Sequence, residues 1–302
     1  MPKQLTQAVI EEWIRLLPEG KFNIRDIWQE VGIESTKGKK HLRVILKRLE
    51  EKGVVSPNGG GGIYRKIDYK APKIDWRSAD PNNFVPLKWP FGIENYALMY
   101  PKNVAIVAGA KQEGKTTFLY EFIRNNMYDY KIDLYNSETG PEQMKDRFLD
   151  MGIPIDAPFE VYERYDNFAD VIDPEAISVI DYLDTNSEFY LIGAEIDAIF
   201  RKLTTGIAVI GMQVPPPQTS MYKGKKQVVT RDYAYGGGVT AKRAFIYITL
   251  LNKKMKIKHV KKPATRYSPE NMMFSYEIDE HGCFANIRPY RPYEEEGGFP
   301  GG

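Results

Sequence analysis

The N-terminal part of the chain repeats apolar residues with the spacing of short helices. Three stretches, Thr6–Leu17, Ile24–Val31 and Thr36–Lys52, place apolar residues three or four positions apart, which predicts three helices. Two short apolar runs follow, at Val54–Val55 and Ile63–Ile67, on either side of a glycine-rich loop. Runs of this kind predict two short strands. The first 70 residues therefore predict a small domain of helices followed by a hairpin.

A different pattern begins after residue 100, where short apolar runs alternate with longer amphipathic stretches. The runs that predict strands are Val104–Ala108, Ile132–Tyr135, Ile177–Ile180 and Ile207–Met212. Helical spacing separates them, as in Thr116–Tyr128 and Phe189–Leu203. Strands that alternate with helices predict an α/β fold with a mostly parallel sheet covered by helices.

Proline and glycine mark the expected boundaries. The prolines that interrupt residues 68–100 are Pro72, Pro81, Pro86 and Pro90. We therefore predict a first domain over residues 1–70, a linker over 71–90 and a larger domain over 91–293. Residues 294–302 combine three glutamates with four glycines, which predicts an acidic, disordered tail.

The net charge of +2 conceals segments of opposite sign. Residues 1–70 carry 14 Lys and Arg against 9 Asp and Glu, and residues 223–266 carry 13 against one. Residues 129–200 are acidic, with 4 basic side chains against 18 acidic ones. Basic ends indicate an anionic partner such as nucleic acid.

The N-terminal order of three helices and two strands resembles a winged-helix domain of the helix-turn-helix family. In that family a recognition helix commonly enters the major groove of DNA, and the third helix would take that role here. The basic side chains that would contact DNA are Lys39, Lys40, Arg43, Lys47 and Arg48. A solvated basic helix on a protein-docking domain is the alternative.

The number of cysteines and the N-terminal residues indicate in which cellular compartment the protein is expected. With one cysteine, Cys283, the chain cannot form an internal disulfide, and three histidines give no metal-ligand spacing. The first residues lack the pattern of a signal peptide, and no apolar stretch approaches the ~20 residues that cross a bilayer. We expect a cytoplasmic protein without membrane contact, in the host cytoplasm if a phage encodes it.

Residues 109–116 read Gly-Ala-Lys-Gln-Glu-Gly-Lys-Thr and lie between a predicted strand and a predicted helix. That context makes the pattern a phosphate-binding loop, in which backbone N–H groups and a helix N-terminus face the phosphates. Lys115 would reach the β- and γ-phosphates of ATP, and Thr116 would bind Mg²⁺. The expected nucleotide-binding residues are Gly109, Ala110, Lys111, Gln112, Glu113, Gly114, Lys115, Thr116 and Thr117.

Three later residues follow in the order found in DnaB-type replicative helicases, which have a RecA-like core. Ser137-Glu138 after the second strand resembles the acidic motif of that family, and the resemblance implies that Glu138 is the catalytic base. Asp181-Tyr-Leu resembles the family's Walker B segment, in which the aspartate is a ligand of Mg²⁺. Gln213 resembles the residue that senses the γ-phosphate. For Glu138 the alternative is an N-cap or a surface glutamate before the helix that begins near Pro141, and for Asp181 it is a cap of the following loop.

The last third of the chain leaves more alternatives open. Lys223–Lys226 and Gly236–Gly238 resemble the loops that line the DNA channel of hexameric helicases, although a surface loop has the same composition. Apolar runs at Ala244–Leu251, Met255–Lys262 and Met273–Ile278 resemble closing antiparallel strands. The candidates for a cation that reaches a neighbouring subunit's nucleotide are Lys258, Lys261, Lys262 and Arg266. A cationic strand edge that discourages aggregation is the alternative.

Together these patterns predict an ATP- and Mg²⁺-dependent hydrolase that acts on DNA. By resemblance it would be a helicase or translocase in DNA replication or recombination, in a phage or mobile element, with a ring or filament of identical subunits and replication proteins as partners. An ATP-switched DNA-binding protein or helicase loader is the main alternative. An interaction module with a structural phosphate loop is a third class.

Overall fold

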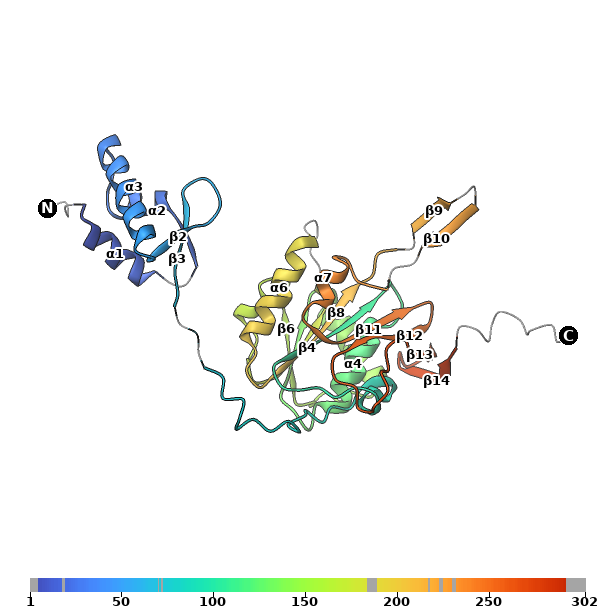
Figure 1. Cartoon of the computed structure of the whole chain (residues 1–302). Helices are drawn as coiled ribbons and strands as arrows, with labels where there is room; N and C mark the ends of the chain where they lie inside the picture. The colour runs from blue at the N-terminus through green and yellow to red at the C-terminus, as the bar shows by residue number, and fades with distance from the viewer. Residues whose placement is uncertain are drawn as a thin grey trace. The chain divides into compact units, whose positions relative to one another are not determined.

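The computed structural model describes residues 5–17, 20–69, 71, 73–183, 189–216, 218–222, 225–229 and 232–291. The chain forms two compact units, Met1–Ala79 and Asp80–Gly302 (Figure 1). In the described residues, no helix combines the length and apolar character that crossing a membrane requires. The predicted tail, 294–302, lies outside the described residues.

The first unit packs three helices against a small antiparallel sheet. Its helices are α1 (Gln7–Leu16), α2 (Ile24–Glu30) and α3 (Thr36–Glu51). Its strands, in the order β1-β3-β2, are β1 (Lys21–Asn23), β2 (Val55–Pro57) and β3 (Ile63–Lys66). The helices agree with the predicted ranges to within one or two residues. Strand β1 was not predicted, because three residues with one buried side chain carry no periodicity.

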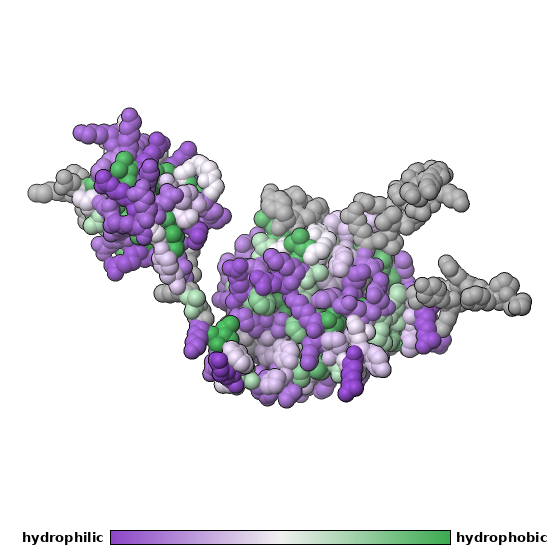
Figure 2. All heavy atoms as spheres, viewed as in Figure 1, coloured by the Kyte–Doolittle hydropathy of each residue, from purple (hydrophilic) through white to green (hydrophobic). Residues whose placement is uncertain are grey.

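Helix α3 separates an apolar face from a basic one. Ser35 caps its N-terminus, with a hydroxyl that accepts a hydrogen bond from the Gly38 amide at 3.1 Å, and the helix buries Leu42, Ile45, Leu46 and Leu49. The predicted DNA-contacting side chains Lys40, Arg43, Lys47 and Arg48 are exposed. Lys39 is half-buried, with its amine 4.7 Å from the centre of the Trp28 ring. Hydrophilic side chains cover most of this unit in the view of Figure 2.

The second unit is built on a nine-stranded sheet with the order β14-β13-β12-β11-β4-β8-β7-β5-β6. Its six parallel strands are β4 (Asn103–Gly109), β5 (Ile132–Asn136), β6 (Phe159–Glu163), β7 (Ile177–Asp181), β8 (Ile207–Gln213) and β11 (Ala244–Leu251). Three antiparallel strands extend it: β12 (Lys254–Val260), β13 (Met273–Ile278) and β14 (Phe284–Tyr290). The expected mostly parallel α/β sheet is therefore present.

One expectation for this sheet needs correction. Ala244–Leu251 was expected among the closing antiparallel strands, but β11 lies parallel to β4, with Ile248 opposite Val107. The antiparallel run begins only with β12. The eight residues of β11 are almost all buried, which is typical of a strand inside a parallel sheet.

Helices cover both faces of the sheet, as Figure 1 shows. They are α4 (Lys115–Asn126), α5 (Pro141–Asp150), α6 (Phe189–Lys202) and α7 (Gly238–Ala241), with 3-10 turns at η1 (Pro90–Asn95) and η2 (Phe168–Asp170). Successive side chains of β4 point to opposite faces of the sheet. Val107 packs in the apolar cluster under α4, and Ile106 packs in the apolar cluster under α6. A separate hairpin, β9 (Gln218–Tyr222) and β10 (Lys225–Val229), projects from the sheet.

The predicted linker is too long at its C-terminal end. Leu87 and Trp89 lie within 71–90, yet both are buried in the core of the second unit. The Trp89 ring lies 4.6 Å from that of Phe122, and Asn126 exchanges hydrogen bonds with the backbone of Lys88. The prolines at 86 and 90 hide this alternating apolar pattern, because they break both helical and strand signals.

Candidate active site

The loop between β4 and α4 has a shape that its glycines make possible. Gly114, directly before α4, has φ 86°, a left-handed conformation that favours glycine. A β-carbon at Gly109 would lie 2.7 Å from Cγ of Lys115 and 3.2 Å from the carbonyl oxygen of Leu250. Only a residue without a side chain fits at Gly109, so the loop can turn closely around the start of α4.

A later strand and a later turn hold this loop from outside. The Tyr276 hydroxyl on β13 donates a 2.6 Å hydrogen bond to the carbonyl oxygen of Glu113. Lys253 donates from its backbone amide to Oε2 of Glu113 at 2.8 Å and from its amine to the carbonyl oxygen of Gln112 at 2.9 Å. Lys253 and Asn252, each with φ 54°, form the two-residue turn between β11 and β12. We call these contacts the loop clamp.

Lys115 is the first residue of α4 and is half-buried. Its amine donates a 3.3 Å hydrogen bond to the carbonyl oxygen of Ala110, so it lies folded over the loop. Burial lowers the pKa of Lys115, while the negative charges of Asp181 and Glu138 act in the opposite direction. The helix N-terminus and this amine together offer positive charge to a phosphate.

Asp181 ends β7 and is 1% exposed. Within the described residues its Oδ1 has no hydrogen-bond partner. Burial raises the pKa of Asp181 to about 6, and hydrogen bonding from the Thr116 hydroxyl acts in the opposite direction. A buried carboxylate oxygen without a partner, beside a hydroxyl, is a suitable donor set for a hard cation that takes oxygen ligands. The predicted pair Thr116 and Asp181 therefore fits Mg²⁺.

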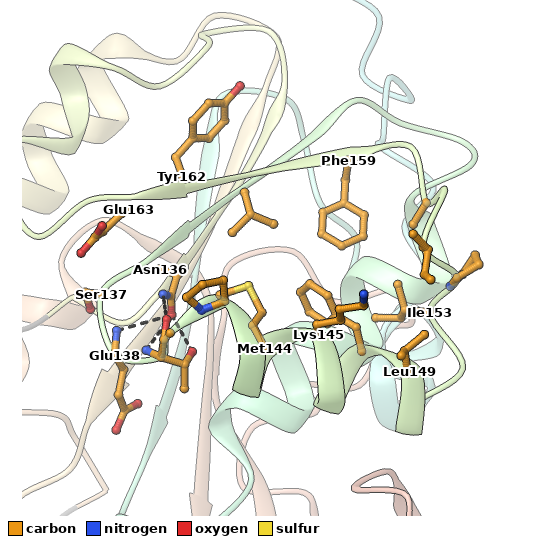
Figure 3. A pocket seen from close by; sticks show the side chains of 18 of the residues that line it. Asn136, Ser137, Glu138, Met144, Lys145, Leu149, Ile153, Phe159, Tyr162 and Glu163 are labelled. Carbon is orange, nitrogen blue, oxygen red and sulfur yellow. Dashed lines mark hydrogen bonds between the residues drawn. The ribbon is translucent and has the colours of Figure 1, made fainter.

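Glu138 is carried by a short loop that a buried asparagine fixes (Figure 3). The Asn136 side chain accepts hydrogen bonds from the amide and hydroxyl of Thr139 at 3.2 and 2.9 Å and donates one to the Thr139 carbonyl at 2.6 Å. Ser137 donates a 2.9 Å bond to the carbonyl oxygen of Tyr182, which ties the loop to the end of β7. The residue that caps α5 is Gly140, so Glu138 does not have the alternative role of a helix cap.

A cavity of about 790 Å³ collects the predicted residues from separate strands. The predicted residues that line it are Lys111, Gln112, Gly114, Lys115, Thr116, Thr117, Glu138 and Gln213. Gly109, Ala110 and Glu113 shape the loop beside it, through the contacts described above. The carboxyl ends of β5, β7 and β8 bring these groups together, as expected for an open parallel sheet.

Sequence reasoning missed several residues of this cavity. Arg147 on α5 lines it, and its charge acts to lower the pKa of the buried Asp181. The Tyr182 ring lies 5.8 Å from the amine of Lys115, and the turn Asp279–Gly282 closes another side. A lone arginine on an amphipathic helix and a turn 160 residues from the phosphate loop carry no motif that would have indicated them.

Two basic residues of β12 have an acidic partner within the chain. Lys256 and Lys258 both contact Oδ2 of Asp232, at 2.8 and 3.0 Å. Lys258 is thereby held by its own subunit in this structure. The structure does not describe the side chains of residues 217–231, so the expected channel loop at Lys223–Lys226 stays a prediction.

The arrangement defines a class of protein. A phosphate loop follows the central strand β4, and acidic residues follow β5 and end β7, two adjacent strands that β8 separates from β4; this is the RecA-like form of the α/β fold. No family model matches the chain, and no curated protein does so either.

A solved structure gives independent support for that fold. The chain is similar to a KaiC-like protein from the hyperthermophilic archaeon Pyrococcus horikoshii, with 17% sequence identity and a TM-score of 0.50. The similarity covers 70% of this chain and 100% of the archaeal one. At this identity the likeness concerns the fold, and it shows a RecA-like α/β fold here.

Proposed function

We propose that this chain binds ATP with Mg²⁺ and hydrolyses it in the cavity between the phosphate loop and Glu138. One observation carries the proposal: a single cavity brings together Lys115, Glu138 and Gln213 from three separate elements, above the unpartnered oxygen of Asp181. A structural phosphate loop would require none of the three at that place. The coarse activity also agrees with the RecA-like fold.

Each residue has a chemical task in this proposal. Amides of residues 110–115 and the amine of Lys115 bind the phosphates and neutralise charge that develops on them. Thr116 and Asp181 hold Mg²⁺, which screens the phosphate oxygens when bound. The Glu138 carboxylate takes a proton from the attacking water. At the same time the water oxygen bonds to the γ-phosphorus, and the bond between that phosphorus and ADP breaks. Gln213 is placed to contact the γ-phosphate.

Arg147 adds a second cation to the same cavity. Arg147 lies on α5, the helix that directly follows the loop of Glu138, so the cation and the base reach the cavity from one continuous stretch of chain. Its planar donors suit phosphate oxygens. We infer that Arg147 binds the terminal phosphate from within the subunit, in addition to any cation from a neighbour.

For the biological role we propose an ATP-driven helicase or translocase acting on DNA. Support comes from the basic exposed face of α3 in the first unit and from the resemblance of Glu138, Asp181 and Gln213 to DnaB-type proteins. The alternative is an ATP-switched DNA-binding protein or helicase loader, for which the same face and the same cavity suffice.

Steady-state ATP hydrolysis separates these roles. The rate is measured with no DNA, with single-stranded DNA and with duplex DNA, together with strand separation of a forked substrate. A motor is expected to accelerate hydrolysis on DNA and to separate strands. Slow turnover that DNA leaves unchanged, with ATP altering only DNA affinity, would favour the switch. Absence of ATP binding would contradict the proposal as a whole.

A further inference from the structure

Tyr120 on α4 keeps a hydroxyl group buried without a partner. The side chain is fully buried, and within the described residues its oxygen has no hydrogen-bond partner. The ring packs edge-on against that of Phe148 on α5, with 4.8 Å between the ring centres. A buried hydroxyl without a hydrogen bond is unfavourable, and a phenylalanine would fill the same space without that penalty. Packing alone therefore does not explain the hydroxyl.

The position of Tyr120 on α4 directs the hydroxyl toward the candidate active site. Tyr120 lies four residues after Thr116, so both side chains are on one face of the helix. Long side chains of a helix point back toward its N-terminus, which here is the end that follows the phosphate loop. Tyr120 accordingly lines the cavity that also contains Lys115 and Glu138.

The groups that shift the pKa of Tyr120 identify the neighbours of its hydroxyl. Burial raises this pKa, and the charges of Asp181 and Glu138 act in the same direction. The Thr139 side chain and the charge of Arg147 act in the opposite direction. The hydroxyl therefore lies on the side of the cavity where the base and its loop are found. Because its pKa is raised, Tyr120 keeps its proton at neutral pH and can donate it in a hydrogen bond.

Thr139 offers an acceptor for that proton. Its own hydroxyl donates to Oδ1 of Asn136 at 2.9 Å, which uses its only hydrogen and leaves lone pairs free to accept. Thr139 directly follows Glu138, and Figure 3 shows Glu138 extending away from Asn136. The bonds of Asn136 thus fix the loop from one direction only. A bond from Tyr120 to Thr139 would fix it from a second element, the helix of the phosphate loop.

We propose that Tyr120 is a positioning residue for ATP hydrolysis: in the nucleotide-bound state its hydroxyl donates a hydrogen bond to Oγ1 of Thr139 and so holds Glu138 toward the attacking water. The bond is open in this structure, and a movement of the loop toward α4 closes it. Thr116, one turn earlier on the same face of α4, is the residue that would hold Mg²⁺. Metal binding and alignment of the base therefore use one helix face. This inference rests on the proposed ATPase and names a residue that it requires.

Steady-state kinetics of Tyr120→Phe in the full chain test the proposal. The variant keeps the ring and removes the hydroxyl, so kcat should fall about ten-fold. The KM and the Kd for ATP should stay within about two-fold, because the hydroxyl does not touch the nucleotide. Thermal unfolding should show a stability at least equal to that of the wild type, since the variant loses a buried hydroxyl that has no partner.

Tyr135→Phe is the matched control for this variant. Tyr135 is also buried, its hydroxyl donates to the carbonyl oxygen of Val171 at 3.3 Å, and it does not line the cavity. Its replacement should leave kcat at the wild-type value. An equal fall in kcat for the control would show a general effect of losing a buried hydroxyl and would overturn the proposal.

Two double variants test whether the hydroxyl acts through Thr139 on the base. Adding Tyr120→Phe to Glu138→Gln should slow hydrolysis no further, because no base is left to position. Adding it to Thr139→Val, which lacks the acceptor oxygen, should likewise have little further effect. Thr139→Ser keeps that oxygen, and in its background Tyr120→Phe should again lower kcat about ten-fold.

The outcomes separate this inference from the proposed function. Wild-type kcat in Tyr120→Phe, equal losses of kcat and ATP affinity, or the full ten-fold loss in either the Glu138→Gln or the Thr139→Val background overturns the inference alone, provided that the wild type hydrolyses ATP. A wild type that does not bind or hydrolyse ATP overturns both.

Discussion

Lys115 and Asp181 are charged side chains kept where burial disfavours their charged forms. The pKa of Lys115 is lowered and that of Asp181 is raised, in both cases mainly by loss of solvent. Their mutual attraction offsets this only in part. Charges held against desolvation in a cavity are typical of a site that binds a charged ligand.

Replacing Lys115 with alanine removes the amine that faces the phosphates. We expect Lys115→Ala to abolish hydrolysis or weaken ATP binding by at least ten-fold, because this charge neutralises the β- and γ-phosphates. Isothermal titration with ATP and a phosphate-release assay measure both effects. Lys202→Ala, at an exposed lysine that ends α6, is the control. A Lys115→Ala chain with wild-type turnover would show that the phosphate-loop assignment is wrong.

Replacing Glu138 with glutamine keeps the shape of the side chain and removes its basicity. We expect Glu138→Gln to retain ATP and to slow hydrolysis by about two or more orders of magnitude, the contribution of a general base. The loop should persist because the Asn136 hydrogen bonds go to the backbone and to Thr139. Single-turnover hydrolysis measures the effect, with Glu142→Gln as control. Equal losses of binding and turnover would point to a structural role.

Replacing Asp181 with asparagine should stabilise the protein while it inactivates the site. The folded pKa is raised from 3.8 to about 6, so the stability that Asp181 contributes is fully present below pH 4 and is lost as pH rises to about 6. Above pH 6, Asp181→Asn should raise the free energy of unfolding by about 3 kcal/mol, because a pKa shift of about two units corresponds to that free energy. Thermal unfolding with EDTA at pH 4 and pH 8 measures it. A variant that melts lower at pH 8 contradicts the prediction.

At the scale of elements, the loop clamp ties the nucleotide site to the antiparallel end of the sheet. Tyr276→Phe removes the hydroxyl that bonds the Glu113 carbonyl and leaves the ring in place. Loss of one such bond costs about 1 kcal/mol, so ATP affinity should fall about five-fold. The maximal rate should change less, because the hydroxyl does not touch the phosphates. Titration and a KM against kcat comparison test this, with Tyr267→Phe as control. A fall in kcat alone would contradict it.

The elements that sequence predicted well are those with a strong local signal. Helix α3 has four buried residues at helical spacing, and the loop after β4 has glycines that its conformation requires. Strand β1, the burial of Trp89 and the parallel pairing of β11 could not be predicted in this way, because each depends on partners distant in sequence.

The residues of the candidate site also fall into those that carry a local sequence signal and those that do not. Lys115, Thr116, Glu138, Asp181 and Gln213 stand at strand ends or in a motif, and the structure brings them to one place. Asn136, Arg147 and Tyr276 carry no such mark, since an asparagine in a turn, an arginine on a helix and a tyrosine in a strand are ordinary residues. Their roles depend on hydrogen bonds and distances that only the fold defines.

At the scale of the molecule, the first unit is expected to act alone. A fragment of residues 1–79 should fold and bind duplex DNA through α3, with affinity that falls steeply as salt rises. Replacing Lys40, Arg43 and Lys47 by alanine should reduce the slope of log affinity against log salt by about one unit per phosphate contact. Fluorescence anisotropy measures this. A charge-matched control replaces Arg15, Lys21 and Arg25, which lie outside α3, and equal losses in both variants would exclude α3 as the contact.

The position of β4 has a consequence for how the protein is made. This strand and the loop after it are complete by residue 116, yet β4 lies between β8 and β11, and the clamp comes from residues 253 and 276. A ribosome must therefore synthesise some 140 further residues before the loop is held. In the meantime β4 lacks its sheet neighbours β8 and β11, which leaves its edges unpaired and prone to aggregation. Nascent chains released before β11 should need a chaperone, and nucleotide can bind the finished site only after residue 276 has been synthesised.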